Sequence, residues 1–152
     1  MKYLTKTGAE KIKKELEDRI QKRKEIAQAI KEAKELGDLS ENAEYSEAKN
    51  QQRENENRVI KLENMIRTYK VVDKKNGNDK VGLDSAIKVE NKTLGKEMFF
   101  HIVGSNEADP SSGNISNESP IGKAFLNKKK NDEVELVLVN GKKVNYKILE
   151  IN

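Results

Sequence analysis

Six acidic side chains gather in one short segment of the chain. They lie between residues 32 and 47, where only Lys34 opposes them: Glu32, Glu35, Asp38, Glu41, Glu44 and Glu47. Carboxylates so close together repel one another, and a hard cation relieves that repulsion. The innermost pair, Asp38 and Glu41, has few other ligands nearby in the sequence. This pattern is typical of an Mg²⁺ ion shared with another molecule.

The same pair also has a simpler interpretation as helix caps. Gly37 suits the end of one helix, Asp38 is a good N-cap for the next, and Glu41 three residues later completes a capping-box pattern. On spacing alone this capping interpretation is favoured. It does not explain why acids occupy these positions, where four further acids already repel them.

Other site chemistries are restricted by what the sequence lacks. Its 152 residues include no Cys and a single histidine, His101. Catalysis by cysteine, thiolate metal sites and multi-histidine zinc sites are therefore excluded. His101 lies among Phe99, Phe100 and Ile102, which predicts an ordinary strand residue. No apolar run is long enough to span a membrane, so we expect a protein that remains in the cytoplasm.

The acidic segment separates two stretches with helical periodicity. Apolar residues recur at spacings of three and four on either side of Gly37: Ala9, Ile12, Leu16, Ile26, Ile30 and Ala33 before it, and Tyr45, Ala48, Val59, Leu62, Ile66 and Tyr69 after it. Two such stripes predict an antiparallel helical hairpin about 40 Å long, with the acids at its tip. Ile30 should lie near Ala48, and the polar residues Arg23 and Asn55 should meet midway.

The rest of the chain predicts a second, smaller domain. β-favouring runs occupy residues 85–90, 97–103, 133–139 and 142–151, and Asn140-Gly141 between the last two is a strong hairpin signal. Ser119-Pro120 predicts the start of a short helix. The fold class is therefore α+β: a coiled-coil arm over residues 1–75, a linker at 76–80, and a mostly antiparallel α+β domain over 81–152.

The tip sequence Gly37-Asp38-Leu39-Ser40-Glu41-Asn42-Ala43-Glu44-Tyr45 resembles that of the Gre family of bacterial transcript cleavage factors. The similarity continues through Val71-Val72-Asp73 and Ile102-Val103-Gly104 to Ser119-Pro120-Ile121-Gly122-Lys123-Ala124, and covers nearly the whole chain. It implies a coiled coil that enters the secondary channel of RNA polymerase and an FKBP-like domain that docks at the rim of that channel. The implied partners are RNA polymerase and the 3′ end of the nascent RNA, and the protein itself is expected to be a monomer.

The resemblance places the chemistry at the tip. The family's essential acids fall on Asp38 and Glu41, and its supporting tip positions on Asn42 and Tyr45. The implied reaction is hydrolysis of a phosphodiester in a backtracked transcript within the polymerase's own active site, so the protein itself would not be an enzyme. Asp38 and Glu41 would share an Mg²⁺ ion with the polymerase and orient the attacking water. The isolated protein would bind no cofactor.

The resemblance also assigns two sets of binding residues. The basic patch beside the tip falls on Lys34 and Lys49, which would neutralise RNA phosphate charge. The polymerase-docking pair falls on Ser119 and Pro120. Ser40 stands where some relatives carry a basic residue, which favours the members of the family with the smaller basic patch.

Two other functions remain open at this stage. A prolyl isomerase is disfavoured, because a proline-binding pocket needs aromatic residues and the second domain has few outside its expected core. A polymerase inhibitor of the same shape is the nearer alternative, although such relatives carry a denser acidic tip. A halted elongation complex with labelled RNA separates the two, because only a cleavage factor shortens the transcript.

Overall fold

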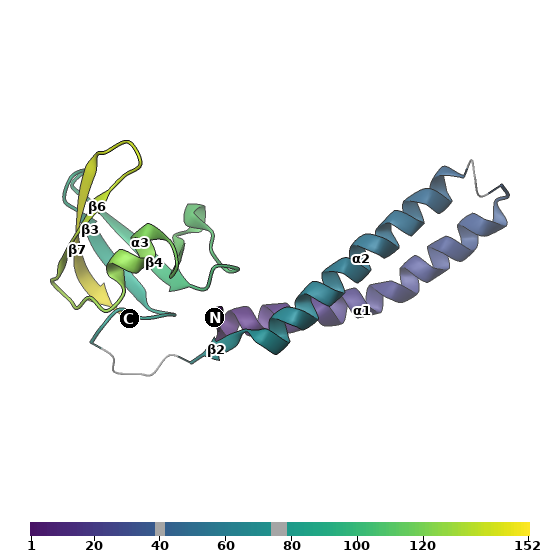
Figure 1. The fold of residues 1–152 in the computed structure, drawn as a ribbon, viewed down its shortest axis with the longest axis horizontal. Helices are drawn as coiled ribbons and strands as arrows, with labels where there is room; N and C mark the ends of the chain where they lie inside the picture. The colour runs from purple at the N-terminus through teal and green to yellow at the C-terminus, as the bar shows by residue number, and fades with distance from the viewer. Residues whose placement is uncertain (39–41, 74–78) are drawn as a thin grey trace. The chain divides into compact units, whose positions relative to one another are not determined.

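The computed structural model spans residues 1–152 and describes residues 1–38, 42–73 and 79–152 (Figure 1). The chain divides into two compact units, one of residues 9–69 and the other of residues 1–8 together with 70–152. No helix in the described ranges is long and apolar enough to cross a membrane. The predicted boundary at residue 75 and linker at 76–80 fall largely outside the described residues and stay predictions.

The first unit is an antiparallel helical hairpin. Its helices are α1 (Lys6–Glu35) and α2 (Ala43–Thr68), which run side by side in Figure 1. With 30 residues, α1 is about 45 Å long at 1.5 Å per residue. The predicted contact near the tip is confirmed, because Ile26 and Ile30 pack against Ala48 in one buried cluster.

The apolar stripe of α2 agrees with the prediction except at its end. Ala48, Val59 and Leu62 are buried, but the next buried side chain is Met65. Ile66, which the periodicity placed in the stripe, is 38% exposed. The buried stripe of α2 therefore continues to Met65 and does not include Ile66.

Polar contacts join the two helices at their middle. The Asn55 side-chain amide donates to the carbonyl oxygen of Arg19 at 2.9 Å, and Arg23 forms a two-pronged ion pair with Glu56, with Nε 2.6 Å from Oε1. The predicted meeting of Arg23 and Asn55 is thus only partly correct. Both residues line a cavity of about 220 Å³, but each finds its polar partner elsewhere.

A second ion pair across the helices changes the pKa of a glutamate. The guanidinium of Arg58 donates to both carboxylate oxygens of Glu15, at 2.6 and 2.7 Å. This hydrogen bonding lowers the pKa of Glu15 below its usual value, against a smaller opposing effect of burial.

The second unit is built around a five-stranded sheet; its mostly antiparallel arrangement was predicted, but its shortest strand, at residues 114–116, was not. The strand order is β5-β4-β3-β7-β6, and every adjacent pair is antiparallel except β4 and β5. The strands are β3 (Ala86–Asn91), β4 (Lys96–Val103), β5 (Asn114–Ser116), β6 (Glu133–Val137) and β7 (Lys143–Ile151). A 3-10 turn, η1 (Pro110–Ser112), precedes β5, and the short helix α3 (Pro120–Phe125) follows it. The predicted α+β fold class is confirmed.

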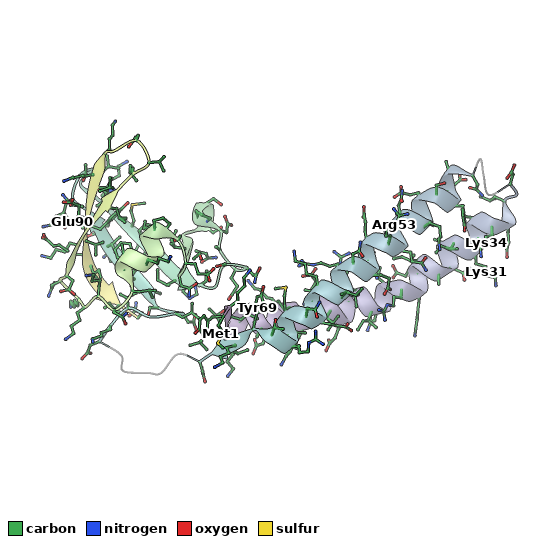
Figure 2. All side chains as sticks on the ribbon, viewed as in Figure 1. Met1, Lys31, Lys34, Arg53, Tyr69 and Glu90 are labelled. Carbon is green, nitrogen blue, oxygen red and sulfur yellow. The ribbon has the colours of Figure 1, made fainter. Side chains whose placement is uncertain are left out.

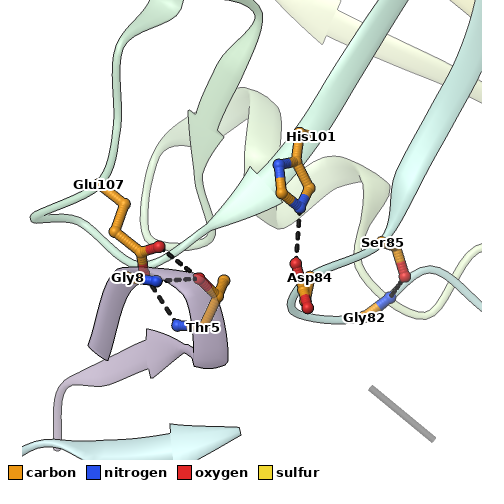
Figure 3. A network of polar contacts seen from close by, with 7 residues as sticks. All are labelled: Thr5, Gly8, Gly82, Asp84, Ser85, His101 and Glu107. Carbon is orange, nitrogen blue, oxygen red and sulfur yellow. Dashed lines mark hydrogen bonds and ion pairs between the residues drawn. The ribbon is translucent and has the colours of Figure 1, made fainter. Parts of the chain in front are cut away.

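One face of this sheet carries the core of the unit. The largest buried side chains include Phe125 of α3 and Ile87, Ile102 and Ile148 of the strands, all at most 1% exposed. His101 is a strand residue of β4, as predicted, and its Nε2 lies 2.7 Å from Asp84 Oδ1. Because its neighbours Phe100 and Ile102 belong to that core, the His101 side chain is on the other face of the sheet, and it lies beside Asp84 (Figure 3).

Two very short strands were not predicted from the sequence. β1 (Tyr3–Thr5) pairs in parallel with β2 (Lys70–Val72), so the chain before α1 is hydrogen-bonded to the chain after α2. The buried Thr5 donates its backbone N–H to Glu107 Oε2 at 2.8 Å and its hydroxyl to Glu107 Oε1 (Figure 3). The same hydroxyl oxygen accepts the N–H of Gly8 at 3.0 Å, as an N-cap does.

Candidate functional site

Asn42 begins the second helix of the hairpin, which corrects the capping interpretation of the tip acids. Asn42 is the N-cap of α2, and its side-chain oxygen accepts the N–H of Tyr45 at 3.1 Å. Its side-chain amide donates to the carbonyl oxygen of Ala33 in the last turn of α1, at 2.6 Å. The prediction that Asp38 caps α2 is therefore wrong, since the helix begins four residues later.

The two acids that carry the candidate chemistry lie in the connection between the helices. Asp38 is exposed and follows Gly37, whose φ of +124° is a backbone conformation that favours glycine. Glu41 lies outside the described residues. Within residues 1–38, 42–73 and 79–152, no three acidic or histidine side chains are close enough to hold a metal ion.

The surrounding acids point to solvent on both helices. Glu32 and Glu35 on α1 and Glu44 and Glu47 on α2 are all exposed. Glu32 and Glu47 each accept one hydrogen bond from a glutamine on the same helix, at 2.9 and 3.3 Å. None of the four forms an ion pair with a residue that the structure describes. These four acids therefore give the end of the hairpin an excess of negative charge.

The three other predicted tip residues fall into two environments. Tyr45 is half-buried and packs against the cluster of Ile26, Ile30 and Ala48, so it supports the end of the hairpin. Lys34 is exposed in the last turn of α1, near the end of the helix in Figure 2. Lys49 is also exposed, and its ammonium group donates to Gln52 Oε1 at 2.8 Å.

The predicted docking pair starts the short helix of the other unit. Ser119 is the N-cap of α3, accepting the N–H of Gly122 at 3.1 Å and donating its hydroxyl to the carbonyl oxygen of Ser116 at 2.7 Å. Pro120 follows at the first helical position and is exposed. The cap and helix start predicted here are confirmed, and a docking role for the two residues stays a prediction.

The two contacts of Asn42, with Tyr45 on α2 and with Ala33 on α1, were not predicted from residue types alone. The available signal was that Asn caps helices as well as Asp does. What the sequence could not show is that an Asn at this position also donates to the carbonyl oxygen of Ala33 in the last turn of α1. Because of this second contact, one side chain fixes both ends of the segment that carries Asp38 and Glu41.

Comparison with known proteins identifies the family. Residues 2–71 match the model described as "Transcription elongation factor, N-terminal", and residues 74–152 match "Transcription elongation factor, GreA/GreB, C-term". Transcription elongation factor GreA of Acetivibrio thermocellus and that of Clostridioides difficile are each 46% identical over 150 residues, covering 97% of this chain and 94% of the relative. The crystal structure of GreA factor homolog 1 of Thermus thermophilus is 27% identical over 99% of this chain and 97% of its own, with a TM-score of 0.43. The chain therefore belongs to the GreA/GreB family of transcription elongation factors.

Proposed function

We propose that this protein binds RNA polymerase, inserts its helical hairpin into the secondary channel and stimulates cleavage of backtracked nascent RNA by the polymerase's own active site. The observation that carries the proposal is the cap formed by Asn42. Because Asn42 begins α2, Asp38 is not needed as its N-cap. An exposed acid that is not the N-cap of α2, at the end of a hairpin whose first helix is about 45 Å long, suits a role in a distant active site.

The tip acids fit a shared metal ion better than a resident one. Mg²⁺ in proteins is often held by one or two carboxylates together with water and substrate phosphates. Asp38 and Glu41 would supply such a pair, with the polymerase and the RNA supplying the remaining ligands. When bound, the ion would neutralise phosphate charge and lower the pKa of the attacking water. Asn42, which links the ends of α1 and α2, and Tyr45, which packs against the cluster at that end, would support the tip.

The lysines beside the tip would contact the RNA. Lys34 and Lys49 are exposed cations on facing helices near acids that would otherwise repel phosphate. Each would attract the phosphates at the 3′ end of the transcript as a point charge. The other unit would bind the polymerase through Ser119 and Pro120. The protein would act as a monomer in the cytoplasm, where the polymerase is.

The test is a cleavage assay on a backtracked elongation complex with labelled RNA. The parent should shorten the transcript. The double variant Asp38→Asn with Glu41→Gln should bind polymerase about as well but cleave at least tenfold more slowly, and each single variant should need more Mg²⁺. Glu44→Gln with Glu47→Gln is the matched control, because it removes the same charge from exposed positions next to the tip.

Two results would contradict the proposal. If the parent binds polymerase but leaves the RNA at full length, the protein is an inhibitor of the same fold. If the double variant cleaves like the parent at every Mg²⁺ concentration, Asp38 and Glu41 do not take part in the reaction. Equal melting curves for the parent and both double variants would show that neither outcome reflects unfolding.

A further inference from the structure

Within residues 79–152, the turn between α3 and β6 carries the most concentrated positive charge. Residues 79–152 contain 11 basic and 11 acidic residues and are neutral as a whole. The thirteen residues between Glu118 and Asp132, however, contain four lysines and no acid. Three of these are consecutive, Lys128, Lys129 and Lys130, and all three are exposed. We call these three residues the basic turn.

The backbone holds the basic turn in place. Asn127 and Asn131 on either side have φ values of +65° and +71°, in the left-handed region that Asn tolerates. The carbonyl of Lys128 accepts the N–H of Val81 at 2.8 Å, and the N–H of Asn131 donates to Ile148 on β7, also at 2.8 Å. The three ammonium groups therefore project from a fixed backbone, and less conformational entropy is lost when they bind a ligand.

The structure places like charges directly opposite each other at this turn. Lys80 and Lys129 are partners in an isolated antiparallel bridge. Like charges in such a pair destabilise a fold. No carboxylate of the described residues forms an ion pair with Lys80 or with the basic turn. Two acids lie beside the turn: Asp132, which accepts the backbone N–H of Lys129 at 2.8 Å, and Asp79, which lines the same hollow as Lys129 and Lys130.

A hollow beside the turn has room for an anionic group. It measures about 340 Å³ and is lined by Asp79, Lys129, Lys130 and Ile151. An anion in this hollow would contact Lys129 and Lys130 and offset their positive charge. The unrelieved repulsion and the open hollow are two separate observations that indicate an anionic ligand.

The residue types indicate which anion. Every basic residue in residues 79–152 is a lysine, and lysine is depleted at protein–protein interfaces, where arginine is enriched. Lysine binds phosphates as a point charge, without a preferred geometry. The segment 126–132 contains no aromatic side chain on which an unpaired base could stack, which disfavours a single strand. We propose that the basic turn binds the phosphate backbone of a nucleic-acid duplex, independently of sequence and at a site other than the hairpin tip.

The test measures binding of a labelled DNA duplex of about 20 base pairs to the full-length protein over a range of salt concentrations. The variant Lys128→Gln, Lys129→Gln and Lys130→Gln should bind at least tenfold more weakly at low salt. Its slope of log affinity against log salt should be shallower by about 2 to 3, since each phosphate contact contributes about 0.9. Both proteins should bind the matching single strand more weakly than the parent binds the duplex.

The matched control is the triple variant Lys96→Gln, Lys142→Gln and Lys143→Gln. It removes the same charge from exposed positions on β4 and at the β6–β7 hairpin, and should bind the duplex nearly as well as the parent. Equal weakening by the two triple variants would show that net charge alone attracts the duplex, and the proposal would be wrong. It would also be wrong if the basic-turn variant kept duplex binding but lost affinity for polymerase, because the turn would then be a protein contact. Transcript cleavage by the parent is measured separately from duplex binding. The function proposed for the hairpin tip can therefore fail or hold independently of the basic turn.

Discussion

Glu107 is predicted to stabilise the start of α1 from 102 residues away in the sequence. Its carboxylate accepts both the backbone N–H and the hydroxyl of the buried Thr5, and that hydroxyl in turn caps the N–H of Gly8. The substitution Glu107→Gln keeps the shape of the side chain but replaces one acceptor oxygen with an amide donor. One of the two Thr5 donors must then lose its partner in a site that is 1% exposed.

The size of the effect follows from that loss. A buried donor left without an acceptor costs about 1–3 kcal/mol, and a hydrogen bond to a charged acceptor is at the upper end of that range. We therefore expect Glu107→Gln to lower the free energy of unfolding by about 2 kcal/mol. Thr5→Val, which removes the cap and keeps the shape, should cost about 1 kcal/mol or more.

Urea unfolding followed by circular dichroism measures the loss, and amide hydrogen exchange locates it. The N–H groups of Thr5 and Gly8 should exchange faster in Glu107→Gln, whereas those in the middle of α2 should not change. Glu150→Gln is the control, because Glu150 is exposed and forms no ion pair with a described residue. If Glu107→Gln unfolds like Glu150→Gln, and its effect adds to that of Thr5→Val without coupling, the contact contributes nothing and the reasoning is refuted.

Three further predictions concern the hairpin, each tested by urea unfolding. Asn42→Ala should cost about 1–2 kcal/mol through loss of the cap, and Asn42→Asp should cost less because it keeps the capping oxygen and loses only the donation to Ala33. Asn55→Leu should leave stability unchanged or higher by up to about 1 kcal/mol, because Asn55 Oδ1 is buried with no partner among the described residues; a large loss would contradict this. The Glu15–Arg58 pair should contribute at most about 1 kcal/mol to the free energy of unfolding above about pH 4.5, the usual pKa of Glu15. This contribution should be lost as the pH falls through the lowered pKa. The stability of Arg58→Gln should therefore depend less on acid pH than that of the parent.

Local pattern was sufficient to predict the long helices and the longer strands. The apolar stripes that contain Ile26 and Ile30 on one helix and Ala48 on the other repeat over several turns, and a helical hairpin buries both stripes against each other. Asn140-Gly141 and its flanking apolar residues similarly determined β6 and β7. These elements are long, and the signal that predicts them lies within the element itself.

The features that were missed depend on contacts between residues far apart in the sequence. Asp38 and Asn42 are equally good N-caps by residue type, and the choice depends on whether the side chain also reaches Ala33. β1, β2 and β5 have only three residues each, too few to show a period of two, and they form because a partner strand is present. The clustering of acids indicated a shared Mg²⁺ ion at Asp38 and Glu41, but their role in RNA cleavage came from the family resemblance, since spacing alone favoured the cap.

The pairing of β1 with β2 makes the hairpin an insertion within the second unit. It therefore determines the order in which the two units can fold during translation. Tyr3–Thr5 leave the ribosome before the whole hairpin, yet their hydrogen-bonding partners, Lys70–Val72 and Glu107, are made only after it. The hairpin needs contacts only within residues 9–69, so it can fold while the rest of the chain is still being translated. The second unit can close only when residues on both sides of the insertion are available. A translation pause before Glu107 should therefore expose a folded hairpin attached to an unfinished sheet.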